Sequence, residues 1–252
     1  MTFEVAAESY DRFMGRYSTQ LAPQLAEFGG ACAGQRLLDV GCGPGALTAE
    51  LVRRLGDGAV SAVDPSEAFV AAAGTRYPGV DVQNASAESL PFGDSSFDAT
   101  FAQLVVHFMA DPVAGLREMR RVTTAGGVVA VSVWDHTGDR TPLAAFWQAA
   151  RELDPDVHDE SGLAGAREGH LAELLAAAGL TSIEETTLTA SARFTSFDEW
   201  WEPFTLGIGP AGAYARKLAE RAREDLRDRC ERLLPPAPFT VDAVAWAARG
   251  TA

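Results

Sequence analysis

The chain has few cysteines and few basic residues, and both shortages limit what it can be. Three cysteines among 252 residues, Cys32, Cys42 and Cys230, are too few and too scattered for a disulfide framework or a zinc site, so we expect a reducing compartment and no metal. Lysine and arginine together number 21 against 35 aspartates and glutamates, which gives a formal charge of −14. Association with nucleic acid or an anionic membrane surface would begin against repulsion, so neither is expected as a partner.

Targeting and membrane-spanning segments are also missing from the sequence. Residues 1–4 have neither the basic nor the apolar region of a signal peptide, and no apolar run is long enough to span a bilayer. We find no internal repeat and no low-complexity linker. Because 47% of the residues are apolar, which is ample for one core, we expect a soluble cytoplasmic protein with a single domain over residues 1–252.

The most informative stretch is residues 36–48, an apolar run that stops in a glycine-rich turn. Gly41, Gly43 and Gly45 remove every second Cβ from the turn, so the backbone can take positive φ and a ligand can approach it closely. Residues 46–55 carry leucines at helical spacing, and the N-terminus of such a helix points free N–H groups at the turn. We interpret Cys42 as a small residue that fills the turn, in preference to a nucleophile. The stretch predicts a ligand-binding corner.

A second acid lies at the distance expected from such a corner. Residues 59–64 are a short apolar run ending in Asp64, about 20 residues beyond the glycines, where an acid at a strand tip can hydrogen-bond to ribose hydroxyls. Pro65 and Ser66 begin the next helix, with the Ser66 side chain as its cap. The alternative is that Asp64 only caps a turn.

Strands and helices alternate as far as residue 134. We expect strands at 80–84, 96–102 and 128–134 and a helix at 111–122, which glycines at 125–127 end. The alternation predicts a parallel, doubly wound sheet whose ligand binds at the carboxyl ends of the strands. Five polar or aromatic side chains fall near that edge: Asp39, Asp64, Ser86, Gln103 and Trp134.

The two ends of the chain are helical in pattern. Residues 4–28 are amphipathic and predict one or two helices that pack on the core; a lid is the alternative, with Tyr10, Met14 and Arg16 as its residues. Beyond residue 135 the ranges expected to be helical are 142–153, 168–178 and 196–234, the last interrupted at Pro203 and at 207–210. Strands are expected at 181–194 and 239–248.

Together these motifs resemble those of the class I S-adenosylmethionine-dependent methyltransferases, especially the small-molecule group that includes the ubiquinone- and menaquinone-biosynthesis type. Residues 37–45 resemble the first motif of that family, residues 62–66 the second and residues 86–92 the third. The likeness covers residues 8–135 and is topological beyond them. It implies an α/β, Rossmann-like, doubly wound sheet of seven strands, mostly parallel with an antiparallel last strand, plus a helical cap.

The resemblance also implies a division of the chain and a set of cofactor contacts. N-terminal lid helices would occupy 1–30, the cofactor-binding core 31–195, the inserted cap 196–234 and the final strand 235–252. Asp39 and the glycine backbone would hold the amino-acid end of S-adenosylmethionine, Asp64 the ribose hydroxyls, and Gln103 and Leu104 would line the floor. Ser86 and Ala87 would bracket the adenine, and the neutral Ser86, where many relatives have Asp, makes a weaker hydrogen bond. The full expected set is Tyr10, Met14, Arg16, Asp39, Gly41, Cys42, Gly43, Gly45, Asp64, Pro65, Ser66, Ser86, Ala87, Glu88, Gln103 and Leu104.

For the methyl acceptor, the sequence suggests a base and an aromatic pocket. His107 follows the fourth strand at the ligand edge and is the candidate catalytic base, with His136 as a second choice; packing in the core is the alternative. Trp134, Trp200 and Trp201 are expected to line a pocket for a small apolar or aromatic acceptor, with core packing equally open.

Other functions remain open at this stage. The glycine turn also fits a nicotinamide-dependent oxidoreductase, although Asp39 before the turn and Pro44 within it speak against a pyrophosphate. A cofactor-binding protein without transfer activity, and a protein or RNA methyltransferase, are further alternatives. The sequence does not identify the acceptor, the atom that is methylated (O, N or C), or the oligomeric state, monomer or homodimer.

Overall fold

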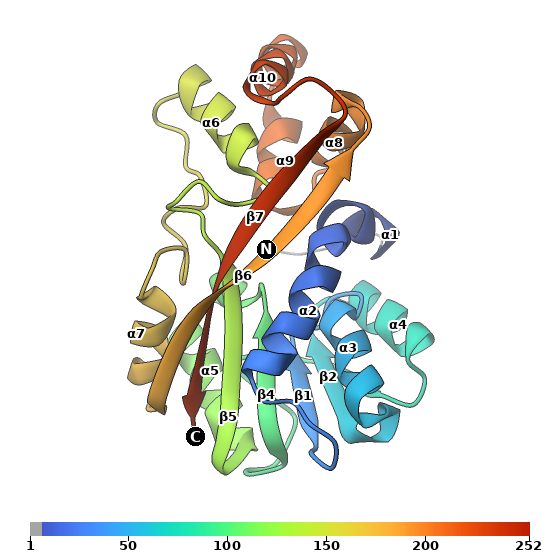
Figure 1. Ribbon diagram of the computed structural model, residues 1–252, viewed down its shortest axis with the longest axis vertical. Helices are drawn as coiled ribbons and strands as arrows, with labels where there is room; N and C mark the ends of the chain where they lie inside the picture. The colour runs from blue at the N-terminus through green and yellow to red at the C-terminus, as the bar shows by residue number, and fades with distance from the viewer. Residues whose placement is uncertain (1–6) are drawn as a thin grey trace.

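The structure is a computed structural model that describes residues 7–252. Residues 1–6, where the expected lid segment begins, lie outside the described part. Seven strands of the described chain form one sheet in the order β3-β2-β1-β4-β5-β7-β6 (Figure 1). Their bounds are Leu37–Val40 (β1), Val60–Asp64 (β2), Asp81–Asn84 (β3), Phe97–Gln103 (β4), Thr123–Trp134 (β5), Thr181–Phe194 (β6) and Phe239–Thr251 (β7). Strands β1 to β5 are parallel to one another, whereas β7 runs antiparallel to both β5 and β6. The expected seven-stranded, mostly parallel sheet is therefore confirmed.

Helices cover both faces of this sheet. The longer ones are Arg16–Phe28 (α2), Ala46–Leu55 (α3), Glu67–Arg76 (α4), Pro112–Val122 (α5), Ala144–Leu153 (α6), His170–Ala177 (α7), Phe197–Thr205 (α8), Gly209–Lys217 (α9) and Glu220–Leu233 (α10). Shorter turns are Ala7–Tyr10 (α1), the π-helical Asp11–Gly15 (η1) and the 3₁₀ segments Asp57–Ala59 (η2) and Val106–Phe108 (η3). Figure 1 shows α2 and α3 on one side of the sheet and α5 and α7 on the other.

Alternation along the strands divides the core into two layers. Leu37 and Phe101 belong to the apolar cluster that includes α2 and α3, whereas their neighbours Leu38 and Ala102 belong to the cluster that includes α5 and α7. This follows from the strand period of two, which sends successive side chains to opposite faces. Both faces of the central strands are buried, so most of their residues are apolar.

The edge strand β6 is protected by two glutamines of α2. The Gln20 side chain accepts a hydrogen bond from Ser191 N and donates one to Ser191 O, and Gln24 does the same with Thr189. Four residues of helix rise about 6 Å, close to the span of two strand residues, so both side chains match the strand. An edge satisfied in this way is a poorer template for pairing with another chain. Figure 1 shows β6 and β7 reaching past the parallel strands toward α8, α9 and α10.

Two sequence-based boundaries were wrong. The glycines at 125–127 do not end the helix: α5 stops at Val122 and β5 begins at once, with Gly126 at φ +82° and a shift of register against β4. A Cβ on Gly127 would lie 2.5 Å from Asp98 O, so these glycines allow a bulge within the strand. Pro203 does not interrupt its helix either, but lies inside α8, where Trp200, Trp201 and Phe204 are all buried and hold the helix against the core.

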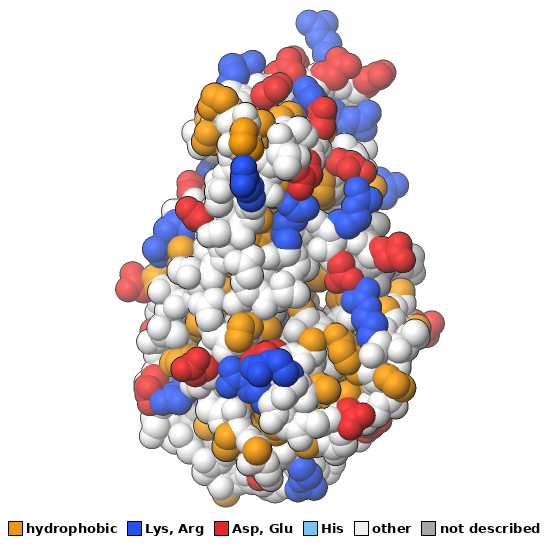
Figure 2. All heavy atoms as spheres, turned by 45° about the vertical axis from the view of Figure 1, so that its right-hand side comes forward, with side chains coloured by type: hydrophobic (Ala, Val, Ile, Leu, Met, Phe, Trp, Pro, Cys, Tyr) orange, Lys and Arg blue, Asp and Glu red, His pale blue; other side chains and the backbone are white. Residues whose placement is uncertain are grey.

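Charged side chains of both signs gather at the end of the molecule that α10 forms, as Figure 2 shows. None of the helices in the 7–252 part has the length and apolar character needed to cross a bilayer.

Packing between α2 and the sheet predicts a steric effect at Gly29. A Cβ at this position would overlap Phe101 Cε1 and lie 2.8 Å from Cζ, in a core without room to yield. We expect Gly29→Ala to lower the free energy of unfolding by about 1–3 kcal/mol. Gly58→Ala is the control, because a Cβ there meets nothing within 4 Å, and it should change stability by less than about 0.5 kcal/mol. Denaturant titration measures both, and equal midpoints would show that α2 is not packed as described.

Candidate functional site

The glycine turn is joined to the neighbouring strand by the carboxylate of Asp64. Asp64 Oδ2 accepts a hydrogen bond from Gly43 N (2.9 Å) and Oδ1 accepts one from Ser66 N (2.8 Å). Ser66 in turn caps α4 by accepting a bond from Phe69 N. Gly41 N and Cys42 N both donate to Val63 O, at 2.8 and 3.0 Å. The tips of β1 and β2 thus form one rigid edge, at the carboxyl ends of parallel strands.

The turn itself has the backbone that the sequence predicts. Gly41, Gly43 and Gly45 have φ of +70°, +55° and +100°, a region that side chains rarely occupy. A Cβ on Gly41 would lie 2.5 Å from Val105 Cγ2, and one on Gly45 would lie 2.5 Å from Tyr77 Cε2, so both positions need glycine for space as well. A Cβ on Gly43 would face open space. Cys42 is buried, and burial raises the pKa of its thiol, which is inconsistent with a nucleophile.

Asp39 is a second buried acid beside the turn. Its Oδ2 accepts a hydrogen bond from Thr48 Oγ1 (2.7 Å), which positions the carboxylate. Burial, with a smaller contribution from the charge of Asp64, raises the pKa of Asp39 to about 7, although the hydrogen bond from Thr48 lowers it. Burial also raises the pKa of Asp64, against the bonds from Ser66 and Gly43. Two buried acids here favour a ligand that brings positive charge and disfavour the pyrophosphate of a dinucleotide.

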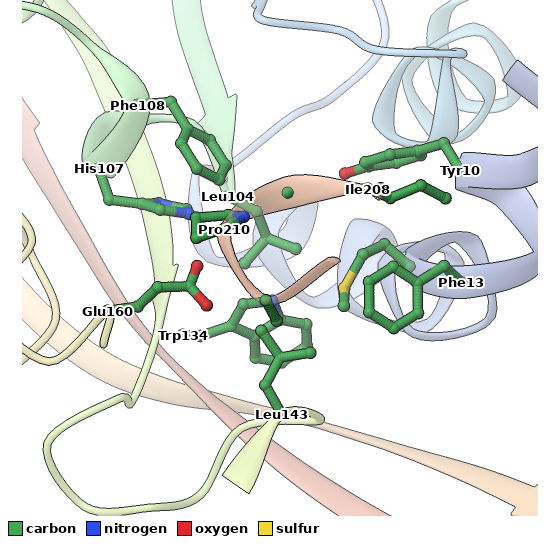
Figure 3. A pocket seen from close by; sticks show the side chains of 13 residues that line it. Tyr10, Phe13, Leu104, His107, Phe108, Trp134, Leu143, Glu160, Ile208 and Pro210 are labelled. Carbon is green, nitrogen blue, oxygen red and sulfur yellow. The ribbon is translucent and has the colours of Figure 1, made fainter. Parts of the chain in front are cut away.

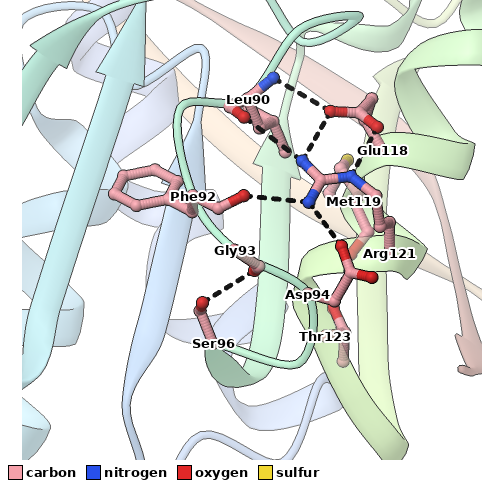
Figure 4. Close-up of polar contacts among 9 residues, drawn as sticks. All are labelled: Leu90, Phe92, Gly93, Asp94, Ser96, Glu118, Met119, Arg121 and Thr123. Atoms are coloured by element: carbon pink, nitrogen blue, oxygen red, sulfur yellow. Dashed lines mark hydrogen bonds and ion pairs between the residues drawn. The ribbon is translucent and has the colours of Figure 1, made fainter.

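The loop after β3 is anchored to α5 by ionic contacts (Figure 4). Arg121 donates to Leu90 O, Phe92 O and both carboxylate oxygens of Glu118, while Leu90 N donates to Glu118 Oε2. Glu88 Oε1 accepts from Ala110 N (2.7 Å), so this side chain holds the start of the next helix. Glu88, which the sequence grouped with the cofactor contacts, therefore has a structural partner, while Ser86 and Ala87 precede it in the loop.

The end of β4 leads from the turn to a cavity. Gln103 Nε2 donates to Ser18 O, and its buried Oε1 has no hydrogen-bond partner among the residues that the structure describes. Leu104 has a left-handed backbone, with φ of +60°, which is uncommon outside glycine. The side chain of Leu104 lines a cavity of about 40 Å³.

This cavity is apolar except at one end (Figure 3). Figure 3 shows the His107 ring and the Glu160 carboxylate on one side of it and the Tyr10 ring on the opposite side. Tyr10 also contacts Phe69 of α4 edge to face, and the charge of Asp64 helps burial raise the Tyr10 pKa to about 12. Tyr10 therefore lies between the cavity and the glycine turn. The full lining is Tyr10, Phe13, Met14, Leu104, His107, Phe108, Trp134, Leu143, Glu160, Ile208, Gly209, Pro210 and Ala211.

Burial disfavours the charged form of each titratable group at the polar end of the cavity, and of His136 next to His107. Burial lowers the pKa of His107 to about 3, with a smaller contribution from His136, and lowers that of His136 to about 4. Burial raises the pKa of Glu160 to about 7, although Trp147 Nε1 donates a hydrogen bond to its Oε2 (2.8 Å).

Some of the expected site residues lie elsewhere. Arg16 points away from the cavity: it pairs with Glu199 (3.3 Å) and stacks on the Phe194 ring. Trp200 and Trp201 are buried among aromatic side chains of α6 and α8 and do not line the cavity, so core packing holds for them. Of the tryptophans proposed for the acceptor, Trp134 does line it.

Sequence analysis missed Glu160 and the 208–211 segment. Glu160 lies in an acidic loop over residues 154–161, to which the sequence assigned no function, yet it is only 3% exposed. Ile208 immediately precedes α9 and Pro210 lies in its first turn, and their place at the cavity depends on how α8 and α9 pack. The one available signal was that Ile208 is an apolar residue within a turn-forming stretch.

Comparison with known proteins agrees with this geometry. A family model described as a methyltransferase domain matches residues 38–131. The chain is 30% identical over 263 residues to a malonyl-acyl-carrier-protein O-methyltransferase of Dechloromonas aromatica, covering 98% of this chain and 92% of that protein. It is 36% identical over 112 residues to a ubiquinone/menaquinone biosynthesis C-methyltransferase of Bdellovibrio bacteriovorus, covering 43% of this chain and 48% of that protein. The chain thus spans about half the length of that second relative.

A solved structure shares the fold. The YcgJ protein of Bacillus subtilis superimposes with a TM-score of 0.59 at 19% identity, covering 91% of this chain and 97% of that one. The full-length match to the Dechloromonas protein and the methyltransferase-domain match over the glycine turn, Asp64 and β4 support the same assignment. This chain therefore belongs to the S-adenosylmethionine-dependent methyltransferases.

Proposed function

We propose that this protein transfers the methyl group of S-adenosylmethionine to a nucleophilic atom of a small, mostly apolar acceptor bound in the cavity beside His107. The observation that carries the proposal is the adjacency of two chemically different sites. Gly41 of the acidic turn lies against Val105, while Leu104 and His107, on either side of Val105 in the chain, line the apolar cavity. A cationic methyl donor and an apolar acceptor would thus meet at the end of β4.

The residues of the turn fit S-adenosylmethionine. The acidic pair Asp39 and Asp64 suits its positive charges and its ribose hydroxyls, and the open space at Gly43 admits its approach to the backbone. Gln103 adds an acceptor at the same edge, Oε1, which has no hydrogen-bond partner within residues 7–252. When bound, the cofactor supplies an activated methyl group on a sulfonium, so the chain's residues need only align the acceptor and exclude water.

The cavity supports an acceptor with an apolar body and one polar group. Its walls are aromatic or aliphatic, and the polar end at His107 and Glu160 is where the nucleophilic atom would lie. His107 would take the acceptor's proton when that atom is a hydroxyl oxygen or a protonated nitrogen. Because burial lowers the pKa of His107 to about 3 in the closed cavity, this role requires that pKa to rise as the cavity widens to admit the acceptor.

An acceptor requires the cavity to widen. A volume of about 40 Å³ is far below the roughly 300 Å³ or more of ligand pockets in general. The segments that close it are the N-terminal η1, which carries Met14, and residues 208–211. Because these two segments close the cavity, we assign residues 196–234 as a cap and the N-terminal helices as a lid. Exposed ion pairs such as Arg12 to Glu202 (3.0 Å) link the two, and such pairs open at little energetic cost.

Removing the Asp64 carboxylate tests the cofactor site. Asp64→Ala removes charged hydrogen bonds worth about 1.5–3 kcal/mol each, so the affinity for S-adenosylhomocysteine should fall by about tenfold to a hundredfold. Asp81→Ala is the matched control, because Asp81 is an exposed acid at the opposite end of the neighbouring strand, and it should bind normally. Calorimetric titration of both, with NAD as a second ligand, measures this. Unchanged affinity in Asp64→Ala, or binding of NAD instead, would contradict the assignment.

Ionisation of Asp39 predicts a pH dependence of cofactor binding. With a pKa of about 7 in the ligand-free protein, the carboxyl is largely protonated at lower pH, whereas a cationic ligand favours the carboxylate. The affinity for S-adenosylhomocysteine should therefore fall as pH is lowered from about 8 to about 6, with proton release on binding. Asp39→Asn should abolish this dependence. Calorimetry in buffers of different ionisation enthalpy detects the proton, and a flat profile in the unmodified protein would refute the role of Asp39.

Replacement of His107 tests the acceptor end. His107→Gln keeps a polar side chain but has no basic nitrogen, so methyl transfer should slow by about 10²–10⁴ while S-adenosylhomocysteine binds as before. The measurement is release of S-adenosylhomocysteine with a panel of phenols, arylamines and medium-chain carboxylic acids. His158→Gln, on the exposed part of the acidic loop, should remain fully active. Full activity of His107→Gln would remove His107 from the reaction.

A further inference from the structure

Three potential metal ligands meet at the polar end of the cavity. They are His107 of η3, His136 just after β5, and Glu160 in the loop between α6 and α7. All three are buried, and one ligand atom from each lies within 4.8 Å of the others. Figure 3 shows the His107 ring and the Glu160 carboxylate directed into the same end of the cavity.

The two histidines have nitrogen atoms that the protein does not use. His107 Nδ1 and His136 Nε2 are both buried without a hydrogen-bond partner in the described chain. Buried polar atoms in native proteins are paired in the great majority of cases, so two orphans in one cluster require an explanation. Burial keeps both imidazoles neutral, and a neutral imidazole offers a free lone pair to an electrophile. By contrast, His170 accepts a hydrogen bond from Gly165 N through Nδ1.

Glu160 differs from the other acids around His136. Asp135 forms an ion pair with Arg140, and Asp159 forms one with Arg151 (2.6 Å). Glu160 accepts a neutral N–H from Trp147 instead, which orients the carboxylate without neutralising its charge. A hydrogen bond of this kind behind a ligand is what holds metal-binding side chains in position.

We propose that His107, His136 and Glu160 bind one divalent transition-metal ion of the Zn²⁺ type. Two imidazole nitrogens with one carboxylate suit zinc and its neighbours, whereas magnesium and calcium favour oxygen ligands alone. Three protein ligands leave a coordination position open, as in catalytic zinc sites. The sequence predicted no metal, because the ligands come from three segments without any recognisable spacing.

The geometry requires a small contraction. Zinc lies about 2.0–2.2 Å from nitrogen and oxygen ligands, so donor atoms around one ion are about 3.5 Å apart. The present separations of up to 4.8 Å need each side chain to move inward by about 1 Å, which a rotamer adjustment next to a cavity allows. Asp135 and Asp159 already favour positive charge at His136, and the net charge of −14 favours a cation overall.

The ion would change how the acceptor is activated, and this part of the inference rests on the proposed function. A His107 nitrogen that ligates a metal cannot use the same lone pair to accept a proton. The metal would take over that task by lowering the pKa of a coordinated hydroxyl or carboxylic acid group. The acceptor class narrows to apolar molecules that carry an oxygen able to coordinate the ion.

The test is metal binding to the full chain without an affinity tag, after removal of metal with a chelator. Calorimetric titration with Zn²⁺ should show one saturable site, and Co²⁺ should give the absorption bands of a low-coordinate ion. His136→Gln and Glu160→Gln should each weaken Zn²⁺ binding by at least about tenfold. Glu160→Gln keeps a side-chain oxygen that can accept the hydrogen bond from the Trp147 N–H, so the conformation of the loop should be preserved. His158→Gln is the matched control and should bind Zn²⁺ normally.

The outcomes separate this inference from the proposed function. Absence of a saturable Zn²⁺ site, or equal affinity in His136→Gln and the unmodified protein, overturns the metal site. Titration of the same samples with S-adenosylhomocysteine shows whether each variant is folded and tests the cofactor independently. Retained cofactor binding with lost Zn²⁺ binding in the two ligand variants supports the metal site, whereas lost cofactor binding in the unmodified protein refutes the proposed function alone.

Discussion

The arrangement of the site depends on one carboxylate, that of Asp64. It accepts hydrogen bonds from Gly43 N and Ser66 N, and so joins the turn after β1 to the start of α4 across the strand pair. Both donors are backbone N–H groups, and the carboxylate at the tip of β2 accepts from each of them. Asp64 is buried, so the turn and the start of α4 meet at a poorly solvated acid. The same contact therefore shapes the turn and prepares it for a ligand.

Two chemically opposite sites follow from this edge. On one side, burial makes the carboxylates of Asp39 and Asp64 unfavourable, and a bound cation would stabilise their charged form. On the other side, beyond Leu104, lies an apolar cavity, and burial keeps His107 at its polar end neutral. Tyr10 lies between them: it lines the cavity, and the charge of Asp64 contributes to its raised pKa. Transfer of a methyl group from a cationic donor to an uncharged acceptor requires the two environments to adjoin. In this fold the end of β4 connects them.

The sequence was most informative where structure is local. Apolar runs located the central strands of the sheet, because burial on both faces leaves a largely apolar signal. It misled where a residue's usual preference was overridden by packing. Gly126 was taken for a helix end and lies in a bulge of β5, and Pro203 remains helical because its neighbours Trp200 and Trp201 are buried. For those tryptophans the sequence left a substrate pocket and core packing equally open, because composition cannot distinguish an aromatic core from an aromatic pocket.

The sequence by itself determined the turn, the acid before it and the acid at the tip of the second strand, since all three are set by short-range backbone requirements within residues 36–66. Only the tertiary structure decided which side chains complete the acceptor end. His107, His136 and Glu160 come from segments separated by up to 53 residues (160 − 107), and no spacing rule relates them. Their meeting depends on how β5 ends beside β4 and how the loop after α6 folds back. Burial then sets their charge, a property of the surroundings that is not contained in residue type.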